Sequence, residues 1–245
     1  MKLTLDVENT VTHRDGKMHL DPFEPENTLV MVGMLTDQGK KTIVTFDHSE
    51  MVVQGIGNHE MVQMMLDEAT VLIMHNAAHD LLWLWESGFK YDGPVFDTML
   101  AEYVLQRGIK EPLSLEACAE RYDLDTKKQD TLKEYFKRGY STRTIPLDEL
   151  SEYLSADLHA TQQLADKLMY RLNTPADSGL MGTVDLTNQV AVCLARIYQR
   201  GFTVDRAALD EVRTECEQER EQLTADLQAH IRKLMGDTPI NLNSP

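Results

Sequence analysis

Alternating polar and apolar side chains mark the first predicted strand, residues Lys2 to Glu8. Two further apolar segments, Thr28 to Leu35 and Lys41 to Phe46, are predicted strands joined by a turn at residues 37–40. Apolar residues at helical spacing then predict a helix from Asn58 to Glu68. The chain therefore opens with a strand-rich segment.

Strands and helices alternate in the next part of the chain. The short apolar run Thr70 to Met74 predicts a buried strand, and Ala78 to Trp85 predicts a helix that ends near Gly88. Val95 and Phe96 indicate a last short strand, which leads into a helix from Asp97 to Leu105. This order predicts an α/β fold, with a mixed sheet and helices on its faces.

From Ser114 onward the pattern is helical. A helix is predicted from Pro146 to Leu172, because proline suits the first helical position and acidic residues follow it. The segment NTPADSG, residues 173–179, has the composition of a linker. Two more helices are expected at about Leu180 to Arg200 and at Asp205 to Met235, where Gly236 is a stop signal.

Composition changes this picture only in part. The 245 residues carry 24 basic and 40 acidic side chains, for a net charge of −16, which by itself disfavours nucleic acid as a partner. The longest apolar run, Leu29 to Leu35, is too short to cross a membrane, so no membrane association is expected. Three widely spaced cysteines and an acidic amino terminus favour reduced thiols in the cytoplasm, or in the host cytoplasm if the protein is viral.

One segment has a net positive charge, in contrast to the chain as a whole. Residues 127–143 hold six basic and two acidic side chains, interleaved with aromatic rings. Cations for phosphates and flat rings for bases are what a single nucleic-acid strand requires. A solvated helix is the commoner interpretation of any one charged run. The basic residues are Lys127, Lys128, Lys133, Lys137, Arg138 and Arg143, and the aromatic ones are Tyr135, Phe136 and Tyr140.

Candidate chemistry lies in three separate segments, each weak alone. Asp6 and Glu8 are two apart on the first strand and share one of its faces. Two solvated acids at a strand edge would show the same pattern. Tyr153 and Asp157 are four apart and share a helix face. The segment Asn76 to Asp80 starts where a buried strand ends, which suits a catalytic group or a simple helix cap.

Together the three segments resemble the DEDDy 3′–5′ exonucleases, which show D-x-E, N-x-x-x-D and Y-x-x-x-D in this chain order. The resemblance is closest to the proofreading domain of family A DNA polymerases, and FDTML at residues 96–100 looks like the segment that follows its second motif. It covers residues 1 to about 172. It implies a ribonuclease H-like fold with a mixed five-stranded sheet flanked by helices, followed by an α-helical carboxyl-terminal segment.

The rest of the chain also fits this family. LARIYQRGFTVDRAALDEV, residues 194–212, resembles the lead-in to the polymerase domain, and NLNSP at 241–245 resembles a segment that follows it. The expected domains are an exonuclease domain at 1–172, a linker at 173–182 and the start of a polymerase domain at 183–245. Palm and fingers regions are absent, so polymerase activity is not expected, and the remaining polymerase fragment is a candidate partner.

The resemblance assigns roles to individual residues. Two divalent ions, Mg²⁺ or Mn²⁺, would be held by carboxylates: Asp6 would bridge both, Glu8 and Asp157 would complete the first site, and Asp80 would support the second. Tyr153 would orient the attacking water. Contacts to the single-stranded 3′ end of DNA are expected from Asn9, Asn76, Lys133, Lys137 and Arg138.

Two other functions stay open at this point. One is a stand-alone ribonuclease D-like exonuclease that trims RNA. The other is a non-catalytic module that binds DNA or docks a separate polymerase fragment. The presence of all four carboxylates and of Tyr153 favours an active enzyme over the second.

Overall fold

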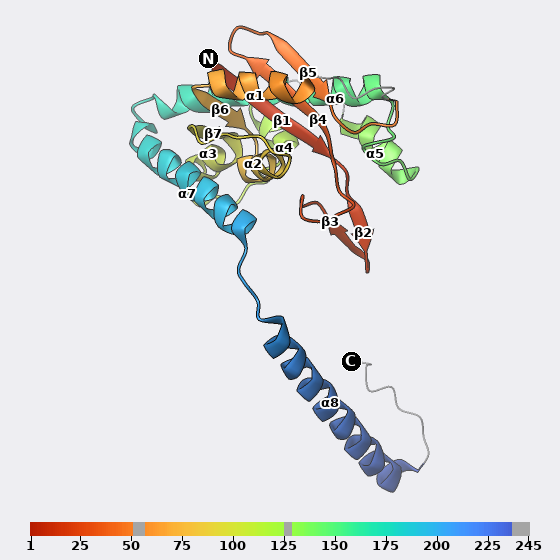
Figure 1. Cartoon of the computed structure of the whole chain (residues 1–245). Helices are drawn as coiled ribbons and strands as arrows, with labels where there is room; N and C mark the ends of the chain where they lie inside the picture. Colours follow the sequence, from red (N-terminus) through yellow and green to blue (C-terminus); the bar gives the residue numbers. More distant parts are fainter. Residues whose placement is uncertain (51–56, 125–128, 237–245) are drawn as a thin grey trace. The chain divides into compact units, whose positions relative to one another are not determined.

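A computed structural model describes residues 1–50, 57–124 and 129–236 of the chain (Figure 1). The contacts divide the chain into two compact units, Met1–Arg200 and Gly201–Pro245. Of the sequence features discussed above, Lys127, Lys128 and the NLNSP segment lie outside the described residues.

The first unit is built on a mixed five-stranded sheet in the order β5-β4-β1-β6-β7. The central strand β1 runs antiparallel to β4 and parallel to β6, and β7 is parallel to β6. The predicted α/β, ribonuclease H-like class is therefore confirmed. The strands are β1 (Lys2–Asn9), β4 (Leu29–Thr36), β5 (Lys41–Thr45), β6 (Val71–Met74) and β7 (Val95–Asp97).

Helices cover both faces of this sheet (Figure 1). Leu3 and Leu5 of β1 pack in one core cluster with residues of α1 and α2. On the opposite face α6 contacts β1, β4, β5 and β6. The helical elements of this unit are α1 (Asn58–Glu68), α2 (Ala77–Glu86), α3 (Thr98–Leu105), α4 (Leu115–Arg121), α5 (Gln129–Lys137), α6 (Leu147–Leu172), the 3₁₀ turn η1 (Ser178–Leu180) and α7 (Met181–Arg200).

A glycine lets α6 approach the sheet closely. Gly33 of β4 pairs with Asp6 of β1, and a Cβ atom added to Gly33 would lie 2.8 Å from Cγ of Leu154 and 2.9 Å from Cδ1 of Leu158. Both leucines belong to α6 and are fully buried. Because Asp157 lies between them in the sequence, this contact sets how closely its part of the helix lies to β1.

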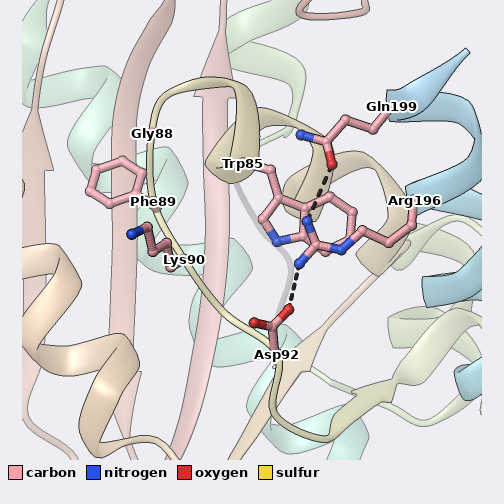
Figure 2. A pocket seen from close by; sticks show the side chains of 7 residues that line it. All are labelled: Trp85, Gly88, Phe89, Lys90, Asp92, Arg196 and Gln199. Carbon is pink, nitrogen blue, oxygen red and sulfur yellow. Dashed lines mark hydrogen bonds and ion pairs between the residues drawn. The ribbon is translucent and has the colours of Figure 1, made fainter.

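The helix α7 belongs to the first unit because it packs on α2, α3 and β7. Figure 2 shows one part of this contact, where the Arg196 guanidinium lies 3.4 Å from the ring centroid of Trp85 and pairs with Asp92 at 2.6 Å. These groups line a small polar pocket that includes none of the predicted site residues. The predicted linker at 173–182 thus lies inside a compact unit, and the domain division drawn from the resemblance stays a prediction.

The second unit contains the helix α8 (Arg206–Met235). Its first turn is capped by Asp205, whose carboxylate accepts hydrogen bonds from the amides of Ala207 and Ala208. Gly236 follows its end with a positive φ of 70°, as its predicted stop role requires. None of the described helices combines the length and the apolar content of a membrane-spanning helix.

A hairpin that the sequence analysis missed follows β1. Strands β2 (Thr12–Arg14) and β3 (Lys17–His19) pair antiparallel as a separate two-stranded sheet. Asp15 and Gly16 between them have positive φ angles of 53° and 71°, the backbone that a two-residue hairpin turn requires. Three-residue strands are too short to show alternation, so the Asp-Gly pair was the one usable signal.

The Gly33 contact predicts that replacing this glycine by alanine lowers the stability of the protein. Alanine in place of glycine should stabilise a strand, but Gly33→Ala should lower the free energy of unfolding by about 1–3 kcal/mol through overpacking against α6. Urea unfolding measures the change. The cost should shrink in a Leu154→Ala background, and Gly179→Ala, where an added Cβ meets nothing within 4 Å, is the matched control. An equal cost in both backgrounds would contradict the close contact.

Candidate active site

The carboxyl-terminal half of β1 presents two acidic side chains on one face of the sheet. Thr4, earlier on the same face, is fully buried, whereas Asp6 and Glu8 are half-buried. The Val7 amide donates to Oδ1 of Asp6 at 3.0 Å. The two carboxylates therefore occur where this face of the central strand opens toward solvent.

The helix α2 adds a third carboxylate. It starts after β6 with Asn76 in the left-handed region at φ 71°, and Asp80 lies in its first turn. Asp80 is 2% exposed, and its Oδ2 atom has no hydrogen-bond partner in the described part of the chain. A buried carboxylate oxygen without a partner is costly, which indicates that a positively charged group is missing from this position.

The helix α6 brings Tyr153 and Asp157. The buried side chains of Leu150, Leu154 and Leu158 fix the helix against the core, and Tyr153 and Asp157 lie beside this buried stripe, half-buried. A hydrogen bond joins the Tyr153 hydroxyl to the Asp157 carboxylate. The i,i+4 spacing predicted from the sequence is therefore realised as a contact.

The electrostatics show that the four carboxylates lie close together. Burial and the charge of Asp157 raise the pKa of Asp6 from 3.8 to about 7. Burial, with the charges of Asp6 and Asp157, raises the pKa of Glu8 well above its usual value. The pKa of Asp80 is likewise raised by burial and by the charge of Asp6. The structure thus brings together side chains from β1, α2 and α6.

The pKa values of Asp157 and Tyr153, the two site residues of α6, are shifted by different sets of causes. Burial raises the pKa of Asp157 to about 6, although the hydrogen bond from Tyr153 opposes this shift. Burial and the nearby charge of Asp157 raise the pKa of the Tyr153 phenol above its usual value. The Tyr153 hydroxyl therefore keeps its proton at neutral pH.

The carboxylates fit a divalent cation by chemistry. Hard oxygen ligands are what Mg²⁺ and Mn²⁺ prefer, and the unpartnered Asp80 oxygen and the mutually raised pKa values both indicate missing positive charge. Among the described residues, however, no three His, Cys, Asp or Glu side chains already form a metal-ligand group. The fit is therefore one of ligand type, because the four carboxylates offer the oxygen atoms that such an ion prefers.

Asp97 supports the site, a role that the sequence analysis did not assign. Its carboxylate is 1% exposed and accepts from the amides of Asn76 and Ala77 at the start of α2, at 3.2 and 2.8 Å. It also caps α3 through the amides of Met99 and Leu100, at 2.9 and 3.2 Å. One carboxylate therefore fixes the start of the helix that carries Asp80; the FDTML segment was the available signal.

The predicted asparagine contacts differ in their surroundings. Asn9 is 8% exposed, and its amide donates to the Thr10 carbonyl at 2.8 Å while its Oδ1 lies 3.0 Å from Nε2 of His79. His79, another residue without an assigned role, thus joins α2 to the end of β1. Asn76 is exposed at the start of α2 and makes no side-chain cap bond.

One residue of the basic segment pairs with an acid whose charge affects the site. Lys133 of α5 lies 3.6 Å from Glu116, and the charge of Glu116 contributes to the raised pKa of Asp157. Arg138, directly after α5, pairs with the exposed Glu134 of that helix at 3.6 Å. The contacts of the described residues place neither Arg138 nor Lys137 against a carboxylate of the site, so their predicted roles stay predictions.

A family model described as 3′–5′ exonuclease, of the DNA polymerase A type, matches residues 18–173. This is more than half of the chain. The chain belongs to this 3′–5′ exonuclease family. The matched range contains Asp80, Tyr153 and Asp157, whereas Asp6 and Glu8 precede it.

Individual relatives extend the comparison. DNA polymerase I of Synechocystis sp. is 28% identical over 174 residues, which are 71% of this chain and 17% of that protein. The chain thus spans about a sixth of the length of this relative. A structure titled as the POL domain of Pol1 from M. smegmatis, in complex with DNA primer-template and dNTP, has a TM-score of 0.60 at 18% identity. It covers all of this chain and 35% of that one.

Brucella melitensis NrnC shares the same exonuclease fold. Its structure bound to pGG has a TM-score of 0.58 at 19% identity and covers 84% of this chain and 88% of that one. A second structure, with bound Mg²⁺, has a TM-score of 0.57. At these identities the likeness concerns the fold alone.

Loss of the double cap should destabilise this exonuclease domain. Asp97→Ala removes the acceptor for the amides of two helix starts, so the free energy of unfolding should fall by about 2–4 kcal/mol. Urea unfolding measures this change. Asp205→Ala removes the single exposed cap of α8 and is the matched control, with an expected cost of about 1 kcal/mol. Equal costs for the two variants would argue against a double role for Asp97.

The raised pKa of Asp6 predicts that a site carboxylate opposes folding in metal-free buffer. The folded state binds a proton at Asp6 more tightly than the unfolded state does. The stability that protonation of Asp6 contributes is therefore fully present below pH 4 and is lost as the pH rises through about 7. Asp6→Asn cannot ionise, so at pH 8 in EDTA it should be more stable than the wild type by about 2–4 kcal/mol. Thermal unfolding from pH 4 to pH 8 measures the difference.

The same series contains its control. At pH 4 the two proteins should differ little, and the exposed Asp185→Asn of α7 should follow the wild type throughout. A pH-independent difference between Asp6→Asn and the wild type would contradict a raised pKa as its cause.

Proposed function

We propose that the chain hydrolyses phosphodiester bonds at the 3′ end of single-stranded DNA, as the proofreading part of a DNA polymerase in DNA replication. The observation that carries this proposal is the gathering of Asp6, Glu8, Asp80 and Asp157, with Tyr153, from three elements of the fold. Membership of the 3′–5′ exonuclease family and the likeness to DNA polymerase I support the choice of reaction and of DNA.

The carboxylates would hold two divalent ions, Mg²⁺ or Mn²⁺. Asp6 would contact both, Glu8 and Asp157 would complete one site, and the unpartnered oxygen of Asp80 would serve the other. When bound, such ions supply activation of water and stabilisation of the departing 3′ oxygen. They would also relieve the mutual repulsion that raises the pKa values of these groups.

Tyr153 would position the attacking water. Its raised pKa keeps the hydroxyl protonated, and its hydrogen bond to Asp157 places it beside the acidic cluster. A protonated phenol is a poor base but a good hydrogen-bonding partner for water. In the reaction the water oxygen bonds to phosphorus, the bond from phosphorus to the 3′ oxygen of the preceding nucleotide breaks, and that oxygen gains a proton. The product is a nucleoside 5′-monophosphate.

The substrate strand would meet cations and amides near the cluster. Lys133 and Lys137 of α5, and Arg138 directly after it, would contact phosphates. Asn76 is exposed at the start of α2. Asn9 would act through the end of β1, where its Oδ1 atom lies 3.0 Å from Nε2 of His79. The link from Lys133 through Glu116 to Asp157 supports this position for α5.

The remaining polymerase fragment is the proposed protein partner, in the cytoplasm. Four apolar side chains of α7 that lie three or four residues apart are each at least 46% exposed. A helix with such a face usually packs on another surface. The four side chains are Leu186, Val190, Leu194 and Ile197.

Digestion of 3′-labelled single-stranded DNA tests the function. With Mg²⁺ or Mn²⁺ the protein should release nucleoside monophosphates from the 3′ end, and EDTA should stop the reaction. Asp6→Ala should lower the rate about a thousandfold or more, as the loss of a central catalytic group does. Asp185→Asn, which changes an exposed carboxylate of α7, should retain full activity.

The outcomes distinguish the other functions. Faster digestion of the matching RNA would support a ribonuclease D-like enzyme, the alternative that the NrnC-like fold leaves standing. DNA binding without cleavage by the wild type would support a non-catalytic module. Undiminished cleavage by Asp6→Ala would refute the site.

A further inference from the structure

The β2–β3 hairpin continues directly from the strand that carries Asp6 and Glu8. Figure 1 shows it leaving the five-stranded sheet beyond the end of β1. Its base is fixed by paired hydrogen bonds: the Thr10 amide donates to the Thr28 carbonyl at 3.0 Å, and the Thr28 amide donates to the Thr10 hydroxyl at 2.7 Å. The hairpin thus starts at a defined position relative to the carboxylates.

A buried asparagine holds the two strands of the hairpin together. Oδ1 of Asn27 accepts from the Thr12 hydroxyl at 2.8 Å, and its Nδ2 donates to the carbonyls of His19 and Asp21 at 3.0 and 2.9 Å. Asn27 is 8% exposed, so these bonds are protected from water. A short two-stranded ribbon is unstable alone, and these side-chain bonds supply the support that it lacks.

Two further contacts tie the hairpin to the body of the domain. Arg14 pairs with the buried carboxylate of Glu24 at 2.6 Å. Nε1 of Trp83 donates to the Leu20 carbonyl at 3.2 Å, which links the hairpin to α2. Because α2 also carries Asp80, the hairpin and the site carboxylates are held on the same elements.

The outer part of the hairpin is exposed despite this support. His13 and Met18 are a cross-strand pair, so they share one face, and the Met18 side chain is 58% exposed. Lys17 is also exposed and forms no ion pair in the described part of the chain. A rigid base under an exposed imidazole, thioether and ammonium group is typical of a binding element.

Charge separates this hairpin from its surroundings. Residues 1–100 contain 16 acidic and 6 basic side chains, a net charge of −10. Within β2, its turn and β3 the basic residues are Arg14 and Lys17, and the one acidic residue is Asp15. His13 and His19 add two imidazoles. Since Arg14 is paired with Glu24, Lys17 is the cation that remains for a ligand.

We propose that the exposed end of this hairpin, with His13 and Met18 on one face and Lys17 on the other, contacts the single-stranded DNA whose 3′ end lies at the carboxylates. Lys17 binds a phosphate, and His13 and Met18 pack against a base or sugar. This rests on the proposed function and adds a second contact surface, separate from α5. Gly16 is eight positions after Glu8 in the sequence, which corresponds to at most about 25 Å of extended chain. Within this reach of the site, the hairpin contacts nucleotides that lie beyond the terminal two.

Substrate length is the variable that tests this contact. The triple variant His13→Ala, Lys17→Ala, Met18→Ala should raise the KM for a 3′-labelled 12-nucleotide DNA strand about tenfold and leave kcat unchanged. For a dinucleotide, which does not extend to the hairpin, neither constant should change. For the 12-nucleotide strand, the slope of log KM against log salt concentration should become shallower by the amount expected for about one phosphate contact.

A matched variant controls for loss of charge. Lys40→Ala removes an exposed lysine from the turn after β4, beside the opposite end of β1, and should behave as the wild type on both substrates. The triple variant should melt at the wild-type temperature, because its side chains contribute exposed surface. An unchanged KM for the 12-nucleotide strand, or an equal loss on the dinucleotide, would overturn the hairpin contact.

Direct binding separates this inference from the proposed function. Fluorescence anisotropy of the labelled 12-nucleotide strand in EDTA reports affinity without cleavage. If the wild type cleaves no nucleic acid but binds this strand more tightly than the triple variant does, the function fails and the hairpin contact holds. If the wild type cleaves the strand and the triple variant matches it in both assays, the hairpin contact fails alone. Absence of both cleavage and binding by the wild type overturns both.

Discussion

The repulsion among four carboxylates at the end of β1 is the constraint on which the rest of the structure depends. Burial and mutual charge raise the pKa values of Asp6, Glu8 and Asp80 together. Among the described residues none of these four groups forms an ion pair, so no basic side chain in that part of the chain offsets them. Such an arrangement persists only because other parts of the fold hold the charged groups in place.

The supports are apolar contacts and backbone hydrogen bonds. Gly33 lets α6 pack against the sheet beside Asp6, and the leucine stripe of that helix supplies the energy of burial. On the other side of β1, the Asp97 carboxylate accepts from the first amides of α2 and so fixes the turn that carries Asp80. Neither support is itself a member of the acidic cluster. The fold therefore separates the residues that carry the chemistry from those that position them.

Much of this architecture could be predicted from the sequence, because its strands and helices have clear periodicity and its acidic residues have a recognisable order. The five sheet strands and the helix that carries Tyr153 and Asp157 were found in this way. The β2–β3 hairpin escaped because its strands have three residues each. The contact of Gly33 with Leu154 and the double cap by Asp97 escaped for another reason. Both join residues distant in the chain, and no local pattern reports such a contact.

The pattern of charge also needs the structure to be interpreted. A net charge of −16 suggests a protein that repels nucleic acid, but part of that charge lies in the carboxylate cluster, which divalent ions would neutralise locally. The basic residues proposed to contact the strand lie on or directly after α5 and on the hairpin, which are separate elements. Attraction for a DNA strand then depends on where the cations lie and on whether the acidic cluster is filled. Carboxylates alone repel phosphate, whereas divalent ions bound to them would attract it. Metal binding and substrate binding should therefore favour each other.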